Sequence, residues 1–471
     1  MIDKNSSSSK SYFSIHSLFE NMGMKSMLLR CGFKKRSGTS PVNLLIAAIS
    51  TVLCGYSNIY EMFCSTFSRS LNVSRDSVYR FLKNDRYNWN TLLLDMSAFV
   101  VKFISSLSDE GHFNTFIIDD TVLERPRSKK TEGLCWIFNH VIGKSVKGFI
   151  DLSLGWSDGI SFVPVSNHLV GARKDKNRIQ GLNKSDRRLS SYERKAELYE
   201  KKPNLALRAL KRALNHGINA SHVLVDSWFF SDTFIASVKE LGLDVICLVK
   251  TNLCFTPLGE CKGLKQSKLF KLAARTDKSE TPALIARTKG GAKVKLVFVT
   301  SYSNSSKILT LASTDLSLSA EQIIRLYSRR WMIEVNYKAQ KQWLGLGTES
   351  QAHNFTTFFS EITICSIRYM LLEFSRRCSN DARSLGELFR STVNEAHEIP
   401  YREALKTLLL LLDELPSDLV KEGLVKPEQK YKVRNLLFNR LNAWLTGVVT
   451  YIRDFISNLE MFKMLKVKNT F

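Results

Sequence analysis

Long apolar runs are missing from this sequence. Unbroken aliphatic runs such as Leu408–Leu412 are far shorter than the roughly 20 apolar residues that a membrane-spanning helix needs. The first residues, MIDKNSSSSKSYF, also lack the apolar core of a secretory signal peptide. We therefore expect a cytoplasmic protein without a membrane anchor.

Closely paired cysteines are missing as well. The nine cysteines are scattered without a CxxC pair, and the tightest group, Cys247, Cys254 and Cys261, has no histidine at ligand spacing. This pattern argues against structural zinc, and an odd number of cysteines in a cytosolic chain argues against a disulfide framework. We expect most of them to be small buried hydrophobic residues.

Acidic residues are scarce relative to basic ones. The chain has 68 Lys and Arg against 44 Asp and Glu, which gives a formal net charge of +24. Such an excess favours a polyanionic partner, and without a membrane anchor nucleic acid is the best candidate. The apolar content of 44% is ample for hydrophobic cores. The length predicts about three domains of roughly 150 residues each.

The most informative stretch is Leu326–Leu344, which reads LYSRRWMIEVNYKAQKQWL. It predicts a continuous helix on which Tyr327, Arg330, Glu334 and Lys341 share one face, because steps of three and seven residues return to nearly the same side. A carboxylate flanked by a phenol, a guanidinium and an ammonium group suits a metal-bound phosphodiester. The plainer interpretation is an amphipathic helix whose charges face solvent.

Two short apolar runs upstream each end in an aspartate. The first is Thr115–Asp119, followed by Asp120, and the second is His222–Asp226. Such runs are typical of buried strands, and a strand fixes the backbone of a carboxylate at its end. With Glu334, these strands supply three carboxylates of the kind that bind Mg²⁺. We predict that the three carboxylates converge on one divalent cation site.

The helical stretch and the two aspartates resemble the DDE transposases of the insertion-sequence-four family. The signature of that family, Y-(2)-R-(3)-E-(6)-K, is matched without gaps by Tyr327, Arg330, Glu334 and Lys341. The resemblance covers about half of the chain, from 115 to 344. It implies an α/β fold: a ribonuclease-H-like core with a β-rich insertion before the last acid, flanked by N- and C-terminal helical regions.

The resemblance also implies the catalytic residues and the cofactor. Asp119, Asp226 and Glu334 would bind two Mg²⁺ ions, for which Mn²⁺ would substitute. Asp119 is the preferred first acid, because the first acid of the family is commonly followed by x-Thr or x-Ser, as in Asp119-Asp120-Thr121. Asp120 is the alternative, since a direct D-T pattern shifts the choice by one residue.

The implied activity is cut-and-paste transposition. Water frees a 3′-hydroxyl at the element end, and this hydroxyl then attacks a second phosphodiester. The implied partners are double-stranded DNA, at terminal inverted repeats and at the target, and a second copy of the chain in the synaptic complex. Tyr327, Arg330 and Lys341 would contact phosphates near the cut. The alternatives are a nuclease that never joins ends, a tyrosine recombinase that uses Tyr327 as nucleophile, and a DNA-binding remnant without activity.

The strand-like runs predict a mixed five-stranded sheet. Three antiparallel strands are expected, with a turn at Asp158-Gly159, followed by two parallel strands joined by a helix. In chain order these elements are Thr115–Asp119, Gly148–Leu154, Ser161–His168, His222–Asp226, the helix Asp232–Leu241 and Asp244–Lys250.

The predicted regions follow from these elements. They are a disordered tail (1–12), a helical DNA-binding domain (13–110), the catalytic core (111–250 and 314–347), the insertion (251–313) and a C-terminal helical region (348–471). Within the second region, Leu71–Lys83 resembles the second half of a helix-turn-helix, with Ser74 as cap and Arg75 and Arg80 facing DNA. The alternative for this segment is a plain packing helix. The basic segment Arg173–Lys202 predicts a phosphate track or, alternatively, a solvated loop.

Overall fold

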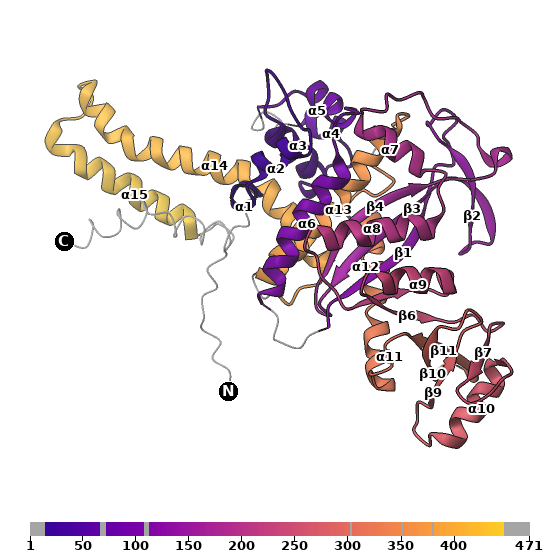
Figure 1. Cartoon of the computed structure of the whole chain (residues 1–471). Coiled ribbons are helices and arrows are strands. Elements are labelled where there is room, and N and C mark those ends of the chain that lie inside the picture. The colour runs from indigo at the N-terminus through magenta and orange to yellow at the C-terminus, as the bar shows by residue number, and fades with distance from the viewer. Residues whose placement is uncertain are drawn as a thin grey trace. The chain divides into compact units, whose positions relative to one another are not determined.

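The computed structural model describes residues 15–65, 72–107, 113–301, 304–349, 352–378 and 381–446. The tail predicted for residues 1–12 lies outside these residues. The chain divides into two compact units, Met1–Ser391 and Thr392–Phe471 (Figure 1). The first unit contains the sheet and the predicted acids.

The centre of the first unit is a five-stranded arrangement in the order β4-β3-β1-β5-β6. Its strands are β1 (Thr115–Glu124), β3 (Lys144–Ser157), β4 (Phe162–Val170), β5 (His222–Val225) and β6 (Asp244–Leu248). Strands β4, β3 and β1 are antiparallel to one another, whereas β1, β5 and β6 are parallel. The predicted α/β class with a ribonuclease-H-like core is therefore confirmed.

Strand β4 is buried on both faces, because helices cover it on either side. All nine of its residues are buried, including Pro164. The pairing of β3 with β4 shifts register between Leu154 and Gly155, and Pro164 lies opposite Gly155. A proline cannot donate to a sheet, so an irregular position of this kind is where a strand tolerates it.

The β-rich segment after β6 continues the same sheet. Strand β11 pairs antiparallel with β6, and the order then runs through β10, β9 and β7 to the short β8. These strands are β7 (Cys254–Pro257), β8 (Leu264–Lys265), β9 (Ala283–Arg287), β10 (Lys293–Ser301) and β11 (Asn304–Ser313), and α10 (Gln266–Thr276) packs on β7 and β9. The insertion is therefore a structural extension of the core.

Two strand features differ from the sequence-based expectation. Strand β1 does not end at Asp119 but continues to Glu124, because β3 pairs with it over that whole length. A further strand, β2 (Cys135–Asn139), pairs with the first part of β3 and forms a hairpin with it. This hairpin was not predicted.

Six helices precede β1 in the described residues. They are α1 (Ile15–Asn21), α2 (Met24–Arg30), α3 (Pro41–Leu53), α4 (Ile59–Cys64), α5 (Arg75–Leu82) and α6 (Trp89–Ser105). The side chain of Ser40 caps α3 by accepting from the amide of Asn43, and Pro41 occupies the first helical position. Helix α6 packs on β4, so the N-terminal helices are joined to the sheet.

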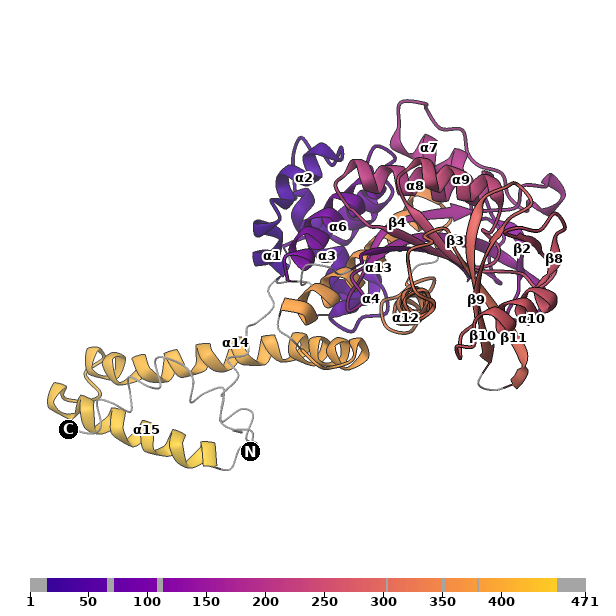
Figure 2. The ribbon, with the colours of Figure 1, turned by 60° about the horizontal axis from the view of Figure 1, so that its bottom comes forward.

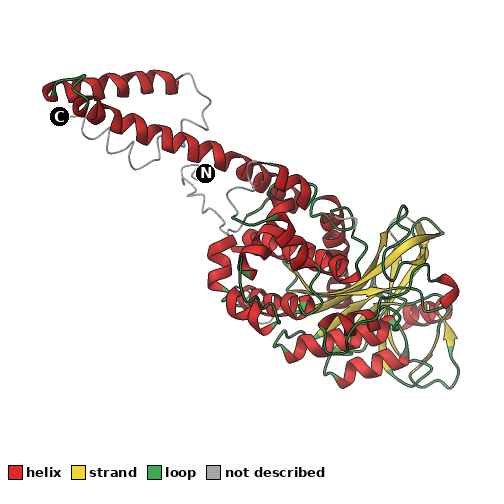
Figure 3. Ribbon diagram, turned by 90° about the horizontal axis from the view of Figure 1, so that it is seen from above, coloured by secondary structure: helices red, strands yellow, loops and turns green. Residues whose placement is uncertain are grey.

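Helices cover both faces of the sheet. After β4 come α7 (Ser190–Glu197), α8 (Lys202–Asn215), α9 (Asp232–Glu240), α11 (Ala320–Ser328), α12 (Trp331–Gln342) and α13 (Phe355–Cys378). In Figure 2, α8 and α9 lie above the sheet and α12 lies below it. Figure 3 shows the strands in yellow with helices around them.

Helix α13 is buried almost throughout, between α6, α3, α12 and β4. It carries a fully buried arginine, Arg368, whose guanidinium pairs with Glu349 at 2.6 Å and 2.9 Å. The same group donates to the carbonyls of Ala48, Ile49 and Leu344. A buried charge needs such complete pairing. Arg368 therefore ties the N-terminal helices to the segment that follows α12.

The second unit begins within the long helix α14 (Leu385–Lys421), which α15 (Lys430–Thr446) follows. An ion pair between Arg434 and Asp413 at 2.8 Å joins the two helices. None of the helices in the described ranges has the length and apolar character needed to cross a membrane.

Candidate active site

The two predicted aspartates lie at matching positions of neighbouring strands, Asp119 within β1 and Asp226 one residue past the end of β5. The parallel pairing of β1 with β5 runs to Ile117 opposite Leu224. Asp119 and Asp226 each follow two residues later, so they are level with each other and on the same face. Strand β5 ends at Val225 while β1 continues. This leaves one side of β1 open, and both aspartates line an open cleft of about 860 Å³ there.

The third predicted acid is joined to the first through an arginine. Nη1 of Arg330 donates to Oδ2 of Asp119 at 2.7 Å, and Nη2 donates to Oε1 of Glu334 at 2.5 Å. Glu334 lies in the first turn of α12. The guanidinium therefore lies between the two carboxylates and neutralises part of their charge.

The expectation of one continuous helix through this motif was wrong. Tyr327 belongs to α11, whereas Glu334 and Lys341 belong to α12, with Arg329 and Arg330 between the helices. The amide of Arg330 donates to the carbonyl of Tyr327 at 2.9 Å, an i to i−3 bond of the tighter 3₁₀ type. The chain thus turns at Arg330, which places its guanidinium at the junction.

Burial and crowding make the charged forms of the aspartates costly. Burial raises the pKa of Asp119 to about 7; Arg330 and the amide of Asp120 oppose this rise, and the charges of Asp226 and Asp120 add to it. Burial also raises the pKa of Asp226. A nearby cation would relieve this cost, and carboxylate oxygens are the ligands that hard divalent cations prefer. The donor set therefore fits a divalent metal.

The described residues do not form a closed metal cage by themselves. In the part of the chain that the structure describes, no group of three or more His, Cys, Asp or Glu side chains is placed to hold one ion. The guanidinium of Arg330 lies between Asp119 and Glu334. Shared ligation by Asp119, Asp226 and Glu334 thus stays a prediction and requires Arg330 to release both carboxylates.

Asp120, the alternative first acid, faces the opposite side of β1. Its Oδ2 accepts from Nζ of Lys202 at 2.6 Å, and Lys202 is the first residue of α8. The ammonium group of Lys202 also lies 4.9 Å from the ring centre of Trp228. Asp120 therefore lines the same cleft as Asp119, but Asp120 is paired with Lys202 of α8, whereas Asp119 meets Arg330 just before α12.

The other two residues of the signature flank these acids. Nζ of Lys341 donates to Oγ1 of Thr121 at 2.6 Å and to the carbonyl of Val122 at 3.1 Å, on the cleft wall. Tyr327 is half-buried beside Arg330, whose guanidinium carbon lies 6.0 Å from the ring centre. Burial raises the pKa of Tyr327 to about 12.

Sequence reasoning missed the buried layer beneath the acids. The hydroxyl of Tyr337 donates to the backbone carbonyl of Asp119 at 2.8 Å. Asp151 is fully buried nearby and accepts from the side-chain amide of Asn167 at 3.1 Å. Burial raises the pKa of Asp151 to about 7, against the hydrogen bonds that lower it. Tyr337 lies three residues after Glu334, and that helical spacing was the available signal.

The two arginines predicted to bind DNA lie apart from this cleft, on α5. Ser74 caps α5 by accepting from the amide of Ser77, as predicted. Arg75 and Arg80 are exposed, while the opposite side of the helix is buried. The guanidinium of Arg75 lies 5.4 Å from the ring centre of Tyr60. Both arginines are therefore accessible to a partner.

The basic segment Arg173–Lys202 is only partly available to DNA. Two of its cations are turned inward: Arg194 pairs with Glu197 at 2.6 Å and Lys195 pairs with Glu132 at 2.7 Å. Their side chains are buried, so they stabilise the fold of α7 against the sheet. The remaining exposed cations of the segment include Arg173, Lys174, Lys176, Lys184, Arg187 and Lys201.

Comparison with known protein families gives two matches. A model described as a DDE superfamily endonuclease matches residues 55–260, and a model described as a transposase DDE domain matches residues 202–371. The two matches overlap and together include Asp119, Asp226 and Glu334. No curated protein matches the chain.

Proposed function

We propose that this chain catalyses cut-and-paste transposition of an insertion sequence. The proposal starts from the matches to a DDE superfamily endonuclease at residues 55–260 and to a transposase DDE domain at residues 202–371. The observation that carries the proposal is the level placement of Asp119 and Asp226 beside an arginine that also holds Glu334. Asp119 and Asp226 line the cleft, and Arg330 links Asp119 to Glu334. Hydrolysis at the element ends would come first, and strand transfer by the freed 3′-hydroxyl would follow.

The residues of the Y-(2)-R-(3)-E-(6)-K signature support membership of the insertion-sequence-four family. Tyr327, Arg330, Glu334 and Lys341 keep that spacing. Arg330 and Lys341 also reach β1 at Asp119 and Thr121. The signature therefore converges on the strand that bears the first acid.

In the proposed mechanism, Asp119, Asp226 and Glu334 hold two Mg²⁺ ions, or Mn²⁺ in their place. When bound, these ions activate the attacking oxygen and stabilise the leaving oxygen of a phosphodiester. Asp119 is preferred to Asp120, because Asp119 shares Arg330 with Glu334 while Asp120 pairs with Lys202.

The proposed roles of the cations follow from their present partners. Arg330 is held by two carboxylates; once these bind metal, its planar fork is free to grip a phosphate in a bidentate way. Lys341 projects from α12 to the rim of the cleft and offers a point charge to a neighbouring phosphate. Tyr327 packs beside Arg330 and limits the orientations of the guanidinium.

The proposed partners are double-stranded DNA and a second copy of the chain. Exposed Arg75 and Arg80 on α5 would bind the terminal inverted repeats. The second unit exposes leucines along α14, with Leu408 at 52% and Leu411 at 59%, and such a surface suits a homodimer in the synaptic complex. The proposed setting is the bacterial cytoplasm, at the nucleoid when bound.

A plasmid assay tests the proposal. Supercoiled DNA carrying the inverted repeats that bracket the reading frame should be nicked at their ends when Mg²⁺ is present. Pre-cut ends incubated with a second plasmid should yield joined products. Nicking without joined products would contradict transposition and would identify the chain as a nuclease.

A nuclease without strand transfer is the second candidate, because one of the family matches is described as an endonuclease. A tyrosine recombinase is disfavoured, since burial raises the pKa of Tyr327 to about 12 and so opposes its use as a nucleophile. A phosphotyrosyl–DNA adduct that survives a denaturing gel would reverse this order.

A further inference from the structure

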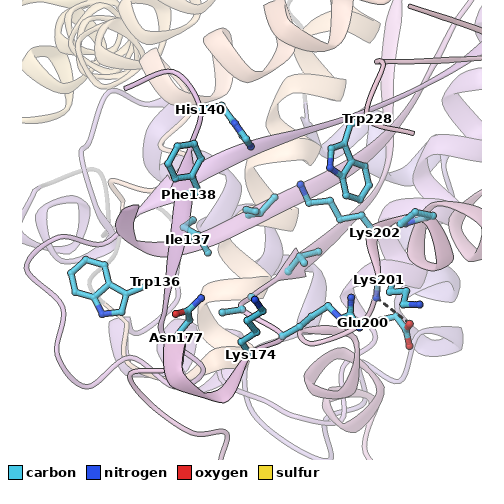
Figure 4. Close-up of a pocket in the computed structure, with 16 residues that line it drawn as sticks. Trp136, Ile137, Phe138, His140, Lys174, Asn177, Glu200, Lys201, Lys202 and Trp228 are labelled. Carbon is cyan, nitrogen blue, oxygen red and sulfur yellow. Dashed lines mark hydrogen bonds between the residues drawn. The ribbon is translucent and has the colours of Figure 1, made fainter. Parts of the chain in front are cut away.

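A second pocket lies next to the catalytic cleft, on the α8 side of the sheet. Its volume is about 500 Å³, and Figure 4 shows the side chains that line it. It shares His140, Lys202 and Trp228 with the lining of the cleft. The two spaces are therefore neighbours, separated at Lys202, which pairs with Asp120.

One wall of this pocket is an exposed aromatic face of β2. Trp136, Phe138 and His140 alternate along the chain and are all exposed, while Ile137 between them is buried. The exposed fractions are 42% for Trp136 and 49% for Phe138. Large aromatic side chains grouped in this way on a surface are typical of binding sites.

The facing wall is basic. Arg173, Lys174, Lys201 and Lys202 line it, and Lys201 and Lys202 begin α8, where the helix dipole is positive. Arg173, Lys174 and Lys201 are exposed, and among the described residues none of them forms an ion pair.

The pocket also contains one acid, which is already engaged. Oε1 of Glu200 accepts from the amide of Lys201 at 3.0 Å and from the side chain of Asn204 at 2.8 Å. Its charge is held against the start of α8. Nζ of Lys147 lies 5.5 Å from the ring centre of Trp136 and meets one face of that ring. The lining therefore offers exposed aromatic side chains and unpaired positive charge together.

We propose that this pocket binds an unpaired segment of DNA, with bases stacked on Trp136 and Phe138 and phosphates along Arg173, Lys174 and Lys201. Stacking needs free base faces, which a single strand offers and an intact duplex does not. Two features favour a DNA strand in this pocket. Its basic wall complements the phosphates, and Trp228 lines both the pocket and the cleft, so one strand could pass from one to the other. This inference rests on the proposed function, because the strand would run from the cleft where cleavage takes place.

The test measures binding to a twelve-nucleotide oligo-dT and to a twelve-base-pair duplex by fluorescence anisotropy, in EDTA and across a range of salt. In Trp136→Ala/Phe138→Ala, affinity for oligo-dT should fall about tenfold or more with the salt dependence unchanged, because stacking is lost and phosphate contacts are kept. Duplex affinity should change less than twofold.

A charge-reversal variant tests the other wall. Lys174→Glu/Lys201→Glu should weaken binding of oligo-dT and make it less steeply dependent on salt, since fewer counterions are released. Tyr431→Ala removes a 71% exposed aromatic outside the pocket, and Lys289→Glu/Lys293→Glu makes the same charge change on the β9–β10 hairpin. Both controls should bind oligo-dT with a smaller loss than the pocket variants.

Crosslinking locates the strand directly. Oligo-dT that carries one 5-iododeoxyuridine should crosslink on irradiation to peptides containing Trp136, Phe138 or Trp228. Crosslinks confined to other peptides, or unchanged affinity of Trp136→Ala/Phe138→Ala for oligo-dT, would overturn the proposal. So would an equal loss of duplex binding, or conversion of a dimer to a monomer, which would assign the aromatic face to a second copy.

The outcomes separate this inference from the proposed function. All binding is measured without metal, so it does not depend on nicking. Normal nicking with no pocket-dependent binding of oligo-dT overturns the inference alone. Pocket-dependent binding in a protein that never nicks element ends upholds the pocket and overturns the proposed function.

Discussion

Asp119, within β1, and Asp226, the residue directly after β5, occupy equivalent positions, each two residues beyond the paired Ile117 and Leu224. Neighbouring strands lie about 4.8 Å apart, so the backbone alone brings the two carboxylates into the same small volume. Asp119 lies within β1, and Asp226 directly follows β5. This placement on the sheet makes the effects of substitutions at the site interpretable.

Removing the carboxylate of Asp226 or of Glu334 should abolish DNA cleavage without abolishing DNA binding. We expect Asp226→Ala and Glu334→Ala to lower the rate of Mg²⁺-dependent nicking about a thousandfold or more, because a divalent ion loses a ligand. Affinity for the element ends, measured by gel shift in EDTA, should stay within about threefold. Equal loss of binding would point to misfolding and would contradict the assignment.

The two adjacent aspartates should behave differently. Asp119→Asn should eliminate nicking, because Asp119 lines the cleft with Asp226 and is bonded to Arg330, which also holds Glu334. Asp120→Asn should retain at least about a tenth of the nicking rate, since Asp120 also lines the cleft but is paired with Lys202 and not with Arg330. Plasmid nicking assays of the two variants test this expectation. If Asp120→Asn were inactive and Asp119→Asn active, Asp120 would be the first catalytic acid.

Arg330 should not tolerate lysine. The guanidinium bonds to Asp119 and Glu334 through two separate nitrogens, and an ammonium group cannot reproduce this fork. Arg330→Lys should lower the nicking rate about ten- to a hundredfold with little change in thermal stability. Arg325→Lys, an exposed change on α11, is the matched control and should nick at nearly the normal rate.

Acid should weaken the fold through Glu197. Burial alone raises the pKa of Glu197, but His168 and Arg194 lower it from 4.5 to about 2. A carboxylate with a lowered pKa stabilises the folded state above its unfolded pKa, so this contribution is complete above about pH 4.5. It is lost as the pH falls toward 2.

Denaturant unfolding between pH 7 and pH 2 checks this expectation. Glu197→Gln should destabilise the protein at pH 7 by about 3–5 kcal/mol, because Arg194 stays buried without its partner. It should also lose stability less steeply than the unchanged protein between pH 4.5 and 2. Glu193→Gln, exposed on the same helix, should follow the unchanged protein.

The sequence predicted the central sheet well because its strands are short apolar runs with clear ends. It could not show that β1 continues past Asp119, because that continuation depends on pairing with β3. Strand β2 was missed for a similar reason: Leu134–Phe138 is a short apolar run, but only its pairing with β3 makes it a strand. Local sequence carries no direct record of such pairing.

The sequence suggested residues for the site but could not give their geometry. The spacing of Tyr327, Arg330 and Glu334 fits one helix as well as two, and only the structure reveals the junction at Arg330. Similarly, a run of basic residues does not disclose which members meet a buried acid, as Arg194 and Lys195 do. Contacts with residues far away in the sequence determine both the break between α11 and α12 and the burial of these cations.

Because β11 is hydrogen-bonded to β6, the segment between the second and third acids cannot be trimmed to make a smaller enzyme. Excision of residues 251–313 would strip β6 of its neighbour and leave a row of unsatisfied amides and carbonyls beside the strand that leads to Asp226. A shortened version would therefore aggregate through that bare edge, and miniaturisation should begin with the second unit instead.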